Sequence, residues 1–285
     1  MKELVVISGK GGTGKTSISA ALAVLAKPVV IADCDVDAAD LHLLLQPEIK
    51  QTEEFFGGKV ARIDSDKCQS CNRCREVCRF DAISTEYVVN PISCEGCGVC
   101  HWNCPHSAIS FTERKDGDLF ISDTRVGPMV HAELGIAEEN SGKLVTRVRN
   151  QARELAEEQN LPFLMVDGPP GTGCPVIASI SGADKLLIIT EPTVSAIHDL
   201  LRVVQLAVHF EMTAIVCINK YDLNLEQTEK IESLCREKNI AIVGKIPYHA
   251  QMTRAQVAGR TIVEGEPSEL KESIIQLWQN IRSIL

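Results

Sequence analysis

Eight of the chain's twelve cysteines form two copies of one spacing, and this repeat constrains the fold more than any other feature of the sequence. Each copy reads C-x2-C-x2-C-x3-C, and the second copy begins 26 residues after the first. In proteins with two such runs, three cysteines of a run hold one [4Fe–4S] cluster and the fourth binds the other cluster. The expected ligands are Cys68, Cys71, Cys74 and Cys104 for one cluster, and Cys94, Cys97, Cys100 and Cys78 for the other.

Residues 60–112 carry this duplication, and both copies end in Cys-x3-Ala-Ile. We interpret the segment as an inserted α+β domain of the bacterial ferredoxin type, between two parts of a larger domain at 1–59 and 113–285. Residues 113–123 are expected to form a hairpin that closes the insertion. The first run ends in Cys78-Arg79 where ferredoxins usually have Cys-Pro, so Arg79 is expected to raise the potential of the second cluster.

Composition narrows the function classes. The formal net charge is −9 and aromatic residues make up 4% of the chain, which disfavours binding to a nucleic acid backbone or to its bases. No apolar run reaches 18 residues, and the N-terminus lacks the features of a signal peptide. We therefore expect a cytoplasmic protein whose cysteines bind metal, because disulfides are rare in that compartment.

Outside the cysteine repeat, short apolar runs alternate with helical patterns, which predicts an α/β domain with a mainly parallel sheet. The expected strands lie at 4–8, 29–32, 163–166, 186–190, 214–219 and 241–246. The expected helices include 15–26, 144–159, 195–209 and 268–284.

A phosphate-binding loop lies between the first strand and the first helix. It reads Gly9-x4-Gly14-Lys15-Thr16, and this strand–loop–helix context is the one the motif requires. Backbone N–H groups of such a loop face the phosphates, its lysine reaches the β and γ oxygens, and its threonine binds Mg²⁺. The predicted nucleotide-binding residues are Gly11, Gly12, Thr13, Gly14, Lys15, Thr16 and Ser17.

A second lysine, Lys10, makes the loop resemble the deviant Walker A motif of the MinD/ParA/nitrogenase-iron-protein family. The resemblance implies a P-loop ATPase in which Lys10 contacts the partner's nucleotide in an ATP-dependent homodimer. Asp33-Cys34-Asp35 resembles the family's switch I, which implies that Asp35 orients the attacking water and Asp33 supports the magnesium shell. Val166-Asp167-Gly168-Pro169-Pro170-Gly171 resembles Walker B with switch II, which assigns Asp167 to Mg²⁺.

Asn219-Lys220-Tyr221-Asp222 follows an apolar run and reads like the guanine-selecting motif of GTPases. In the family that the chain resembles, the corresponding asparagine contacts adenine. The resemblance therefore implies ATP as the nucleotide, with GTP as the alternative.

Two features near the C-terminal half leave alternatives open. Cys174 lies seven residues after Asp167, where the nitrogenase iron protein has a cluster ligand at its dimer seam. We expect Cys174 to be a buried small apolar residue, with metal binding between two subunits as the alternative.

Cys217 and Cys235 are expected in the core. The helix at 268–284 lacks a basic polar face, so we expect it to pack in the core rather than on a membrane.

The combination resembles MinD-superfamily ATPases that contain an inserted ferredoxin domain. It implies ATP-driven electron transfer or metal-cofactor maturation on a partner, of the class of nitrogenase-cofactor-biosynthesis or orange-protein-type proteins. Two alternatives remain, namely an ATP-dependent Fe–S cluster carrier and a ParA/MinD-like positioning ATPase. The carriers use a C-x2-C pair in the C-terminal half, and no such pair follows Cys104.

Overall fold

The computed structural model describes residues 1–135 and 141–285. The described chain forms two compact units. The first consists of Met1–Thr52, Leu119–Glu133 and Ser141–Leu285, and the second contains Glu53–Asp118 with the short stretch from Leu134. The predicted domain boundaries, after residue 59 and after residue 112, fall inside two long strands, Glu48–Ile63 and Ile109–Asp123. Each of these strands has one end in the first unit and the other end in the second unit.

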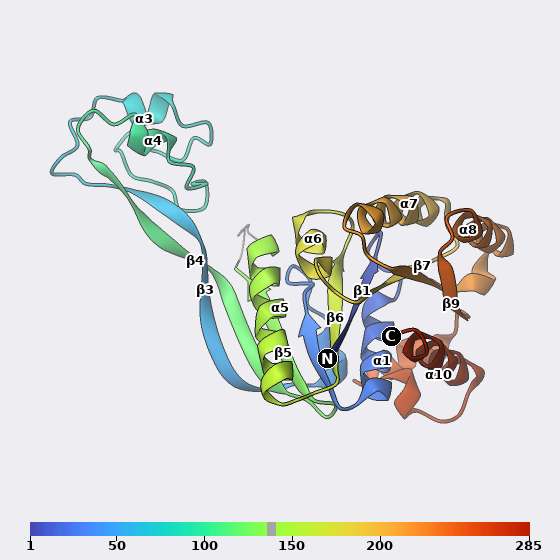
Figure 1. Cartoon of the computed structure of the whole chain (residues 1–285). Helices are drawn as coiled ribbons and strands as arrows, with labels where there is room; N and C mark the ends of the chain where they lie inside the picture. Colours follow the sequence, from blue (N-terminus) through green and yellow to red (C-terminus); the bar gives the residue numbers. More distant parts are fainter. Residues whose placement is uncertain (136–140) are drawn as a thin grey trace. The chain divides into compact units, whose positions relative to one another are not determined.

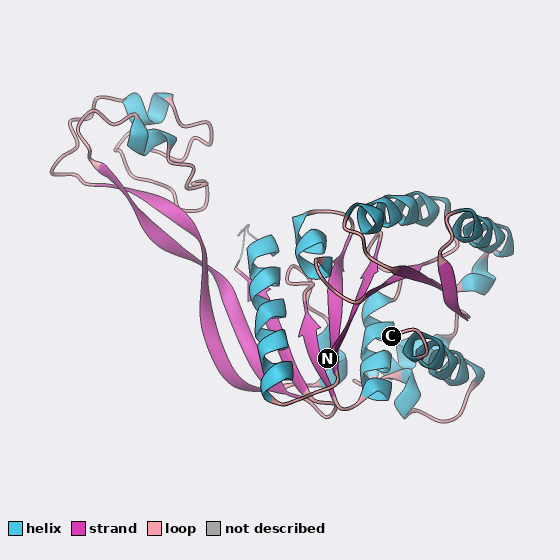
Figure 2. Cartoon of the chain, viewed as in Figure 1, coloured by secondary structure: helices cyan, strands magenta, loops and turns pink. Residues whose placement is uncertain are grey.

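Nine strands of the described chain form one sheet, in the order β3-β4-β5-β2-β6-β1-β7-β8-β9 (Figures 1 and 2). The strands are β1 (Lys2–Ser8), β2 (Val29–Asp33), β3 (Glu48–Ile63), β4 (Ile109–Asp123), β5 (Pro128–Leu134), β6 (Phe163–Pro170), β7 (Lys185–Thr190), β8 (Ala214–Asn219) and β9 (Ala241–Ile246). From β5 to β9 in this order, every neighbouring pair is parallel. The predicted mainly parallel α/β sheet is therefore confirmed.

The α-helices of the first unit are α1 (Lys15–Ala26), α2 (Leu41–Leu45), α5 (Ser141–Glu158), α6 (Cys174–Ile180), α7 (Val194–His209), α8 (Leu225–Glu237), α9 (Ala250–Val257) and α10 (Glu269–Arg282). Two 3-10 turns, η1 (Tyr221–Leu223) and η2 (Ile262–Glu264), complete the unit. Helices lie on both faces of the sheet (Figure 1). Both faces of the central strands are thus covered, which is why their sequences are continuous apolar runs rather than alternating ones.

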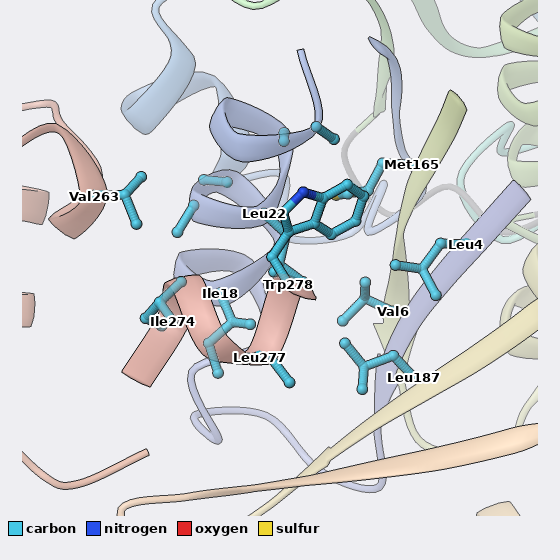
Figure 3. Close-up of a cluster of buried hydrophobic side chains, with 14 of the residues drawn as sticks. Leu4, Val6, Ile18, Leu22, Met165, Leu187, Val263, Ile274, Leu277 and Trp278 are labelled. Carbon is cyan, nitrogen blue, oxygen red and sulfur yellow. The ribbon is translucent and has the colours of Figure 1, made fainter. Parts of the chain in front are cut away.

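The main core lies between the sheet and helices α1 and α10. Leu4 and Val6 of β1 and Leu187 of β7 point into it, because alternate residues of a strand share a face. Leu277 and Trp278 of α10 close the core from the other side, as Figure 3 shows. The α10 residues Leu270, Ile274, Leu277, Trp278 and Ile281 are all buried, so the prediction that the C-terminal helix packs in the core is confirmed. Within the described chain, no helix has the length and apolar character needed to cross a membrane.

On the opposite face, α5 is fixed to β1 by a buried ionic network. The Glu3 carboxylate is 4% exposed and accepts from Arg149 Nε at 2.5 Å and from Arg153 Nη2 at 2.7 Å. Arg149 also donates to the carbonyl oxygens of Ala178 and Ser181, at the end of α6. A buried carboxylate is tolerated here because its charge is paired on both oxygens. The network fixes the helices beside the strand that leads to the phosphate-binding loop.

The second unit has little apolar core. It contains the far ends of β3 and β4 and two helices of one turn, α3 (Arg73–Glu76) and α4 (Val99–Trp102). Its hydrophobic core cluster has six buried residues, Ala61, Cys74, Ala82, Ile83, Cys94 and Ile109. The hairpin expected at 113–123 is wrong, because these residues belong to the single continuous strand β4.

Candidate nucleotide site and cysteine clusters

The phosphate-binding loop occupies the turn between β1 and α1. Gly12 (φ 78°) and Gly14 (φ 89°) are in the left-handed region, which residues with a Cβ atom rarely adopt. The first turn of α1 is closed by the Ile18 N–H donating to the Gly14 carbonyl oxygen at 3.1 Å. The loop lines a pocket of about 470 Å³ at the carboxyl ends of the parallel strands, which is the usual ligand position in open α/β sheets. All the predicted loop residues line this pocket: Gly11, Gly12, Thr13, Gly14, Lys15, Thr16 and Ser17.

The structure places Lys15 among carboxylates that come from two other strands. Its Nζ lies 3.1 Å from Oδ2 of Asp167, in the carboxyl-terminal half of β6, and 3.4 Å from Oδ2 of Asp35, which follows β2; the lysine side chain is 6% exposed. Burial alone lowers the pKa of Lys15, but Asp167, Asp35 and Asp33 outweigh this effect and raise it. The lysine therefore stays charged in a buried position, where an ammonium group can bind phosphate oxygens.

Asp33 of β2 and Asp167 of β6 are paired neighbours on these two parallel strands, and both are almost fully buried. Burial raises the pKa of Asp33, and the neighbouring Asp167 acts in the same direction. Burial also raises the pKa of Asp35, while Lys15 opposes the shift. Asp33 accepts from the backbone N–H groups of Asp35 and Leu41, which fixes its orientation.

Two buried oxygen atoms at this site have unused bonding capacity among the described residues. Asp167 Oδ1 accepts from Ser19 Oγ at 2.7 Å, but Oδ2 accepts no hydrogen bond and has only the ion pair with Lys15. Thr13 Oγ1 is likewise buried without a hydrogen-bond partner. Buried polar atoms in this state usually belong with a ligand, water or ion. The carboxylates and the nearby Thr16 hydroxyl are hard oxygen donors, which suits Mg²⁺.

Asn219 supports the loop from β8. Its Nδ2 donates to the Thr13 carbonyl oxygen at 2.7 Å, and its Oδ1 accepts from the Lys220 N–H at 3.0 Å. Both side-chain atoms are thus engaged with backbone in this structure, although Asn219 also lines the pocket. Asp222 is engaged as well, because its Oδ1 accepts from the Tyr248 N–H at 2.7 Å.

Lys10 lies outside the group of pocket-lining residues and is held by its own chain. Its Nζ is 2.8 Å from Glu191 Oε1 and 3.2 Å from the hydroxyl oxygens of Thr193 and Ser195. Glu191 also pairs with Lys220 at 2.9 Å, and Lys220 Nζ donates to the Gly12 carbonyl oxygen at 2.9 Å. One carboxylate therefore joins the two lysines that flank the loop.

Neither Glu191 nor the residues on the far side of the pocket belong to a motif that can be recognised in the sequence. That side is formed by Pro247, Tyr248, His249, Met252 and Gln256. Gln256 donates to Ser17 Oγ at 2.6 Å. Their position along the chain is the one feature that indicates them. Glu191 directly follows β7 and Pro247 directly follows β9, at the carboxyl edge of the parallel sheet where ligands bind.

The eight repeat cysteines fall into two groups of four. One cavity is lined by Cys68, Cys71, Cys74 and Cys104, and a separate cavity is lined by Cys78, Cys94, Cys97 and Cys100. These are the two ligand sets expected from the crossing of the fourth cysteines. Backbone N–H groups donate to sulfur in both groups, among them that of Ala108 to Cys104 at 3.4 Å and that of Ala61 to Cys94 at 3.5 Å.

Neither group is arranged around a single ion. Among the described residues, no three His, Cys, Asp or Glu side chains converge closely enough to hold one metal ion. Four cysteines that hold a four-iron cluster stay apart, because the cluster core lies between them. Four cysteine thiolates around one cavity are a donor set that both four-iron clusters and zinc ions use, and the C-x2-C-x2-C-x3-C spacing of the chain is the one typical of the cluster.

The remaining cysteines differ in exposure. Cys217 and Cys235 are buried, as expected, and burial raises the pKa of both, that of Cys235 to about 11. Cys34 is also buried, and burial raises the pKa of its thiol. The expectation that Cys174 is a buried apolar residue is wrong, because it begins α6 and is exposed.

A glycine-rich loop between a parallel strand and a helix, with a buried lysine among strand-end carboxylates, defines a P-loop nucleotide-binding protein. Residues 4–262 match the CobQ/CobB/MinD/ParA nucleotide binding domain, and the chain belongs to this family. The MinD and ParA proteins of the family are ATPases, which supports ATP binding and hydrolysis here.

Three relatives illustrate the range of the match. The uncharacterized protein MJ0578 of Methanocaldococcus jannaschii is 33% identical over 99% of this chain and 97% of its own length. The iron-sulfur cluster carrier protein of Pyrococcus horikoshii is 23% identical over 98% of this chain and 85% of its own. The structure of the septum site-determining protein MinD of Pyrococcus horikoshii, complexed with Mg-ADP, has a TM-score of 0.62 at 16% identity. It covers 99% of this chain and 96% of that one, and it shows the fold to be that of an α/β P-loop NTPase.

Proposed function

We propose that this protein is an ATP-binding and ATP-hydrolysing iron–sulfur protein that couples nucleotide-dependent dimerisation to electron transfer or metal-cofactor maturation on a partner protein. The observation that carries the proposal is the grouping of the cysteines. The sequence predicts two ligand sets of four cysteines, in which the fourth cysteine of each run joins the other run. Two separate cavities of the second unit are lined by those same two sets. Two [4Fe–4S] clusters bound there would supply one-electron transfer at low potential.

At the nucleotide site, the chain's own residues bind and orient the triphosphate. Loop N–H groups from Gly11 to Ser17 and the N-terminus of α1 face the phosphates, and Lys15 neutralises their charge. Thr16, Asp33 and Asp167 are the residues that would hold Mg²⁺, directly or through its water shell. The bonding capacity left at Asp167 Oδ2 supports this assignment.

We assign Asp35 the role of orienting the attacking water. Its carboxylate is near the Lys15 ammonium, lines the pocket and belongs to the loop that follows β2. The phosphates of the nucleotide compete with the Asp35 carboxylate for the Lys15 ammonium. When a phosphate binds Lys15, the Asp35 carboxylate becomes free to accept a hydrogen bond from a water molecule. We assign catalysis to Lys10, Lys15 and Asp35.

We assign Lys10 to the nucleotide of the partner subunit in a face-to-face dimer. In the single chain its ammonium is paired with Glu191, so dimerisation must replace that pair with phosphate contacts. The exchange is feasible because the pair is partly exposed, and such pairs stabilise by only about 0–1 kcal/mol.

ATP is favoured over GTP. Asp222 occupies the position that reads guanine in GTPases, yet its carboxylate already accepts the Tyr248 N–H. Asn219 is held by the loop and by Lys220, so base contacts beyond Asn219 fall to the segment from Pro247 to Met252. A GTP affinity equal to the ATP affinity would contradict this assignment.

The partner we propose is a protein that accepts electrons or a metal cofactor, of the nitrogenase-cofactor-biosynthesis or orange-protein class. The acidic chain, with a net charge of −9, is unsuited to nucleic acid. We assign the protein to the cytoplasm, where free thiols persist as metal ligands.

The second candidate is an ATP-dependent carrier that delivers Fe–S clusters, and it is favoured by the likeness to the iron-sulfur cluster carrier protein. The two functions differ in how firmly the clusters are held. In anaerobic protein, a ferrous chelator together with an apo-acceptor should leave the iron content and the cluster absorbance unchanged if the clusters transfer electrons. Release of iron to the acceptor, accelerated by ATP, would favour the carrier and contradict the leading proposal.

A further inference from the structure

The second unit contains a buried ion pair whose two residues do not line the cysteine cavities. Asp116 of β4 is 0% exposed, although the unit has little apolar core around which to bury a carboxylate. Arg114 Nε lies 2.8 Å from Asp116 Oδ1, and the arginine side chain is 14% exposed. Taking a carboxylate and a guanidinium out of water is costly, so a pair in this position needs further bonding to be tolerated.

Strand β3, the neighbour of β4 in the sheet, leaves room for this pair. A Cβ atom at Gly57 would lie 2.8 Å from Asp116 Oδ2, and one at Gly58 would lie 3.0 Å from the same oxygen and 3.1 Å from Arg114 Nη2. Non-bonded heavy atoms are most favourable at about 3.5–4.0 Å, so a side chain at either position would displace the pair. The two consecutive glycines therefore allow the ion pair to lie against β3.

The other end of the arginine reaches the loop that begins the second cysteine run, residues 91–97, which we call the ligand loop. Arg114 Nη1 donates to the Cys94 carbonyl oxygen at 3.2 Å and to the Pro91 carbonyl oxygen at 3.4 Å. Cys94 itself is buried, and its sulfur accepts the Ala61 N–H of β3 at 3.5 Å. The guanidinium thus connects a buried carboxylate of β4 to the backbone of an expected cluster ligand.

The ligand loop also packs closely against β3. Gly96 has φ 61°, and a Cβ atom there would lie 2.3 Å from the Lys59 carbonyl oxygen, so the two backbones approach too closely for any residue but glycine. Gly96 lines the same cavity as Cys94 and Cys97. Both long strands therefore hold this side of the cavity, and Arg114 supplies bonds from β4.

We propose that Arg114, held by Asp116, is a positioning residue that fixes the ligand loop in the form in which Cys94 binds a four-iron cluster. This inference rests on the proposed function, because it requires that the cavity lined by Cys94 holds a cluster. A ligand that is held by its surroundings before the cluster binds loses less conformational entropy on binding. The guanidinium suits this role, since its planar fork can donate to the carboxylate and to both carbonyl oxygens at once.

The test is the iron content of the whole protein, purified anaerobically, together with the reactivity of its cysteines toward iodoacetamide. Cysteines that hold a cluster are shielded from alkylation, and Cys71 and Cys97 report on the two cavities because both are exposed in the chain. Cys174 is exposed outside the cavities and serves as the internal standard. We expect Arg114→Gln to fall from about eight to about four iron atoms per chain. Cys97 should then be alkylated to the same extent as Cys174, while Cys71 stays protected.

Two further variants and a control separate geometry from charge. Arg114→Lys keeps a cation beside Asp116, but one ammonium group cannot replace the fork that reaches both carbonyls, so Cys97 should again become reactive. Gly58→Ala should displace the ion pair and have the same effect. Arg62→Gln removes an exposed arginine of β3 and should keep about eight iron atoms.

Arg114→Gln protein that keeps about eight iron atoms and a protected Cys97 would overturn the inference. Equal alkylation of Cys71 and Cys97 would overturn it as well, because a pair that only supports the fold of the unit would affect both cavities. Full iron in Arg114→Lys would contradict the role of the carbonyl bonds. If Arg114→Gln does not fold, Gly58→Ala decides the question by the same criteria.

The wild type separates this inference from the proposed function. Wild-type protein with two clusters leaves the proposed function standing whatever the variants show. Wild-type protein without clusters refutes that function and this inference with it.

Discussion

The nucleotide site and the cysteine cavities are organised by different physical means. Around the nucleotide site, Lys15, Asp167 and Ser19 are buried and contact one another, and an extensive apolar core supports the strands that carry them. In the second unit, two of the six buried core residues, Cys74 and Cys94, belong to the expected ligand sets. The first site is held in shape by contacts between protein atoms, whereas under the proposed function the second unit would depend on the clusters that its cysteines hold.

This difference indicates which substitutions should affect ligand binding and which should affect folding. Substitution of a nucleotide-site residue removes one contact from a site that the apolar core also supports. Such a substitution should therefore lower nucleotide affinity more than it lowers the stability of the fold. Under the proposed function, loss of a cysteine ligand would also remove part of the framework of the second unit.

The largest effect is expected from Cys74→Ser. Cys74 is buried in the small core and lines one cavity together with Cys68, Cys71 and Cys104, so the variant should lose at least one cluster and the order of the second unit, while ATP binding persists. Iron analysis, hydrogen exchange and ATP titration measure the three quantities. Cys235→Ser is the matched control, a buried cysteine of α8 outside the cavities, and it should keep its iron. Collapse of both units in Cys74→Ser would contradict the contrast.

Next in size is Lys15→Ala. The variant removes a phosphate ligand, and contacts to charged groups contribute about 1.5–3 kcal/mol, or about 10–150-fold in ATP affinity. It also leaves Asp33, Asp35 and Asp167 without their buried cation, so the first unit should lose some stability. Lys238→Ala, a loss of an exposed lysine, is the control. Unchanged ATP affinity in isothermal titration would refute the assignment of Lys15, and loss of iron would break the independence of the two sites.

Asp35→Ala should bind ATP but not hydrolyse it, because the attacking water loses its acceptor. The variant should therefore accumulate as an ATP-bound dimer, seen as a doubled mass in sedimentation. Adding Lys10→Ala should weaken that dimer while nucleotide binding by the single chain stays nearly unchanged. An Asp35→Ala protein with the same mass with and without ATP would rule out the closed dimer.

The smallest effect is expected from Glu191→Gln. The variant releases Lys10 from its ion pair in the single chain, which should favour the ATP-bound dimer by about two- to fivefold, since a partly exposed pair contributes up to about 1 kcal/mol. Analytical ultracentrifugation with a non-hydrolysable ATP analogue measures the change. Glu237→Gln, an exposed glutamate at the end of α8, should behave as wild type. A weaker dimer in Glu191→Gln would mean that Glu191 supports Lys10 rather than restraining it.

The sequence predicted the nucleotide-binding unit well where burial produces a regular pattern. Helix α1 and strands β8 and β9 were predicted to the residue, because an Ala/Leu-rich helix and continuous apolar strands have few other interpretations. Strand β3 was missed, since Gly57, Gly58 and several charged residues interrupt its apolar pattern. These glycines lie against the Asp116 side chain of the neighbouring strand, a contact between residues far apart in the sequence.

The candidate sites show the same limit. Lys15, Asp33 and Asp167 were predicted because each belongs to a motif with a fixed place in the fold, and the structure brings them together. Glu191 was not predicted, because a single carboxylate after a strand has no motif around it. Its importance arises from Lys10 and Lys220, which reach it from distant parts of the chain.

The most direct test of the central claim is the metal content of anaerobically purified protein, measured together with its ATP binding. The protein should contain about eight iron atoms and about eight acid-labile sulfides per chain, from two four-iron clusters. The same sample should bind one ATP per chain. Zinc in place of iron, or only about four iron atoms in fully loaded protein that still binds ATP, would contradict the claim that one chain joins a P-loop ATPase to two iron–sulfur clusters.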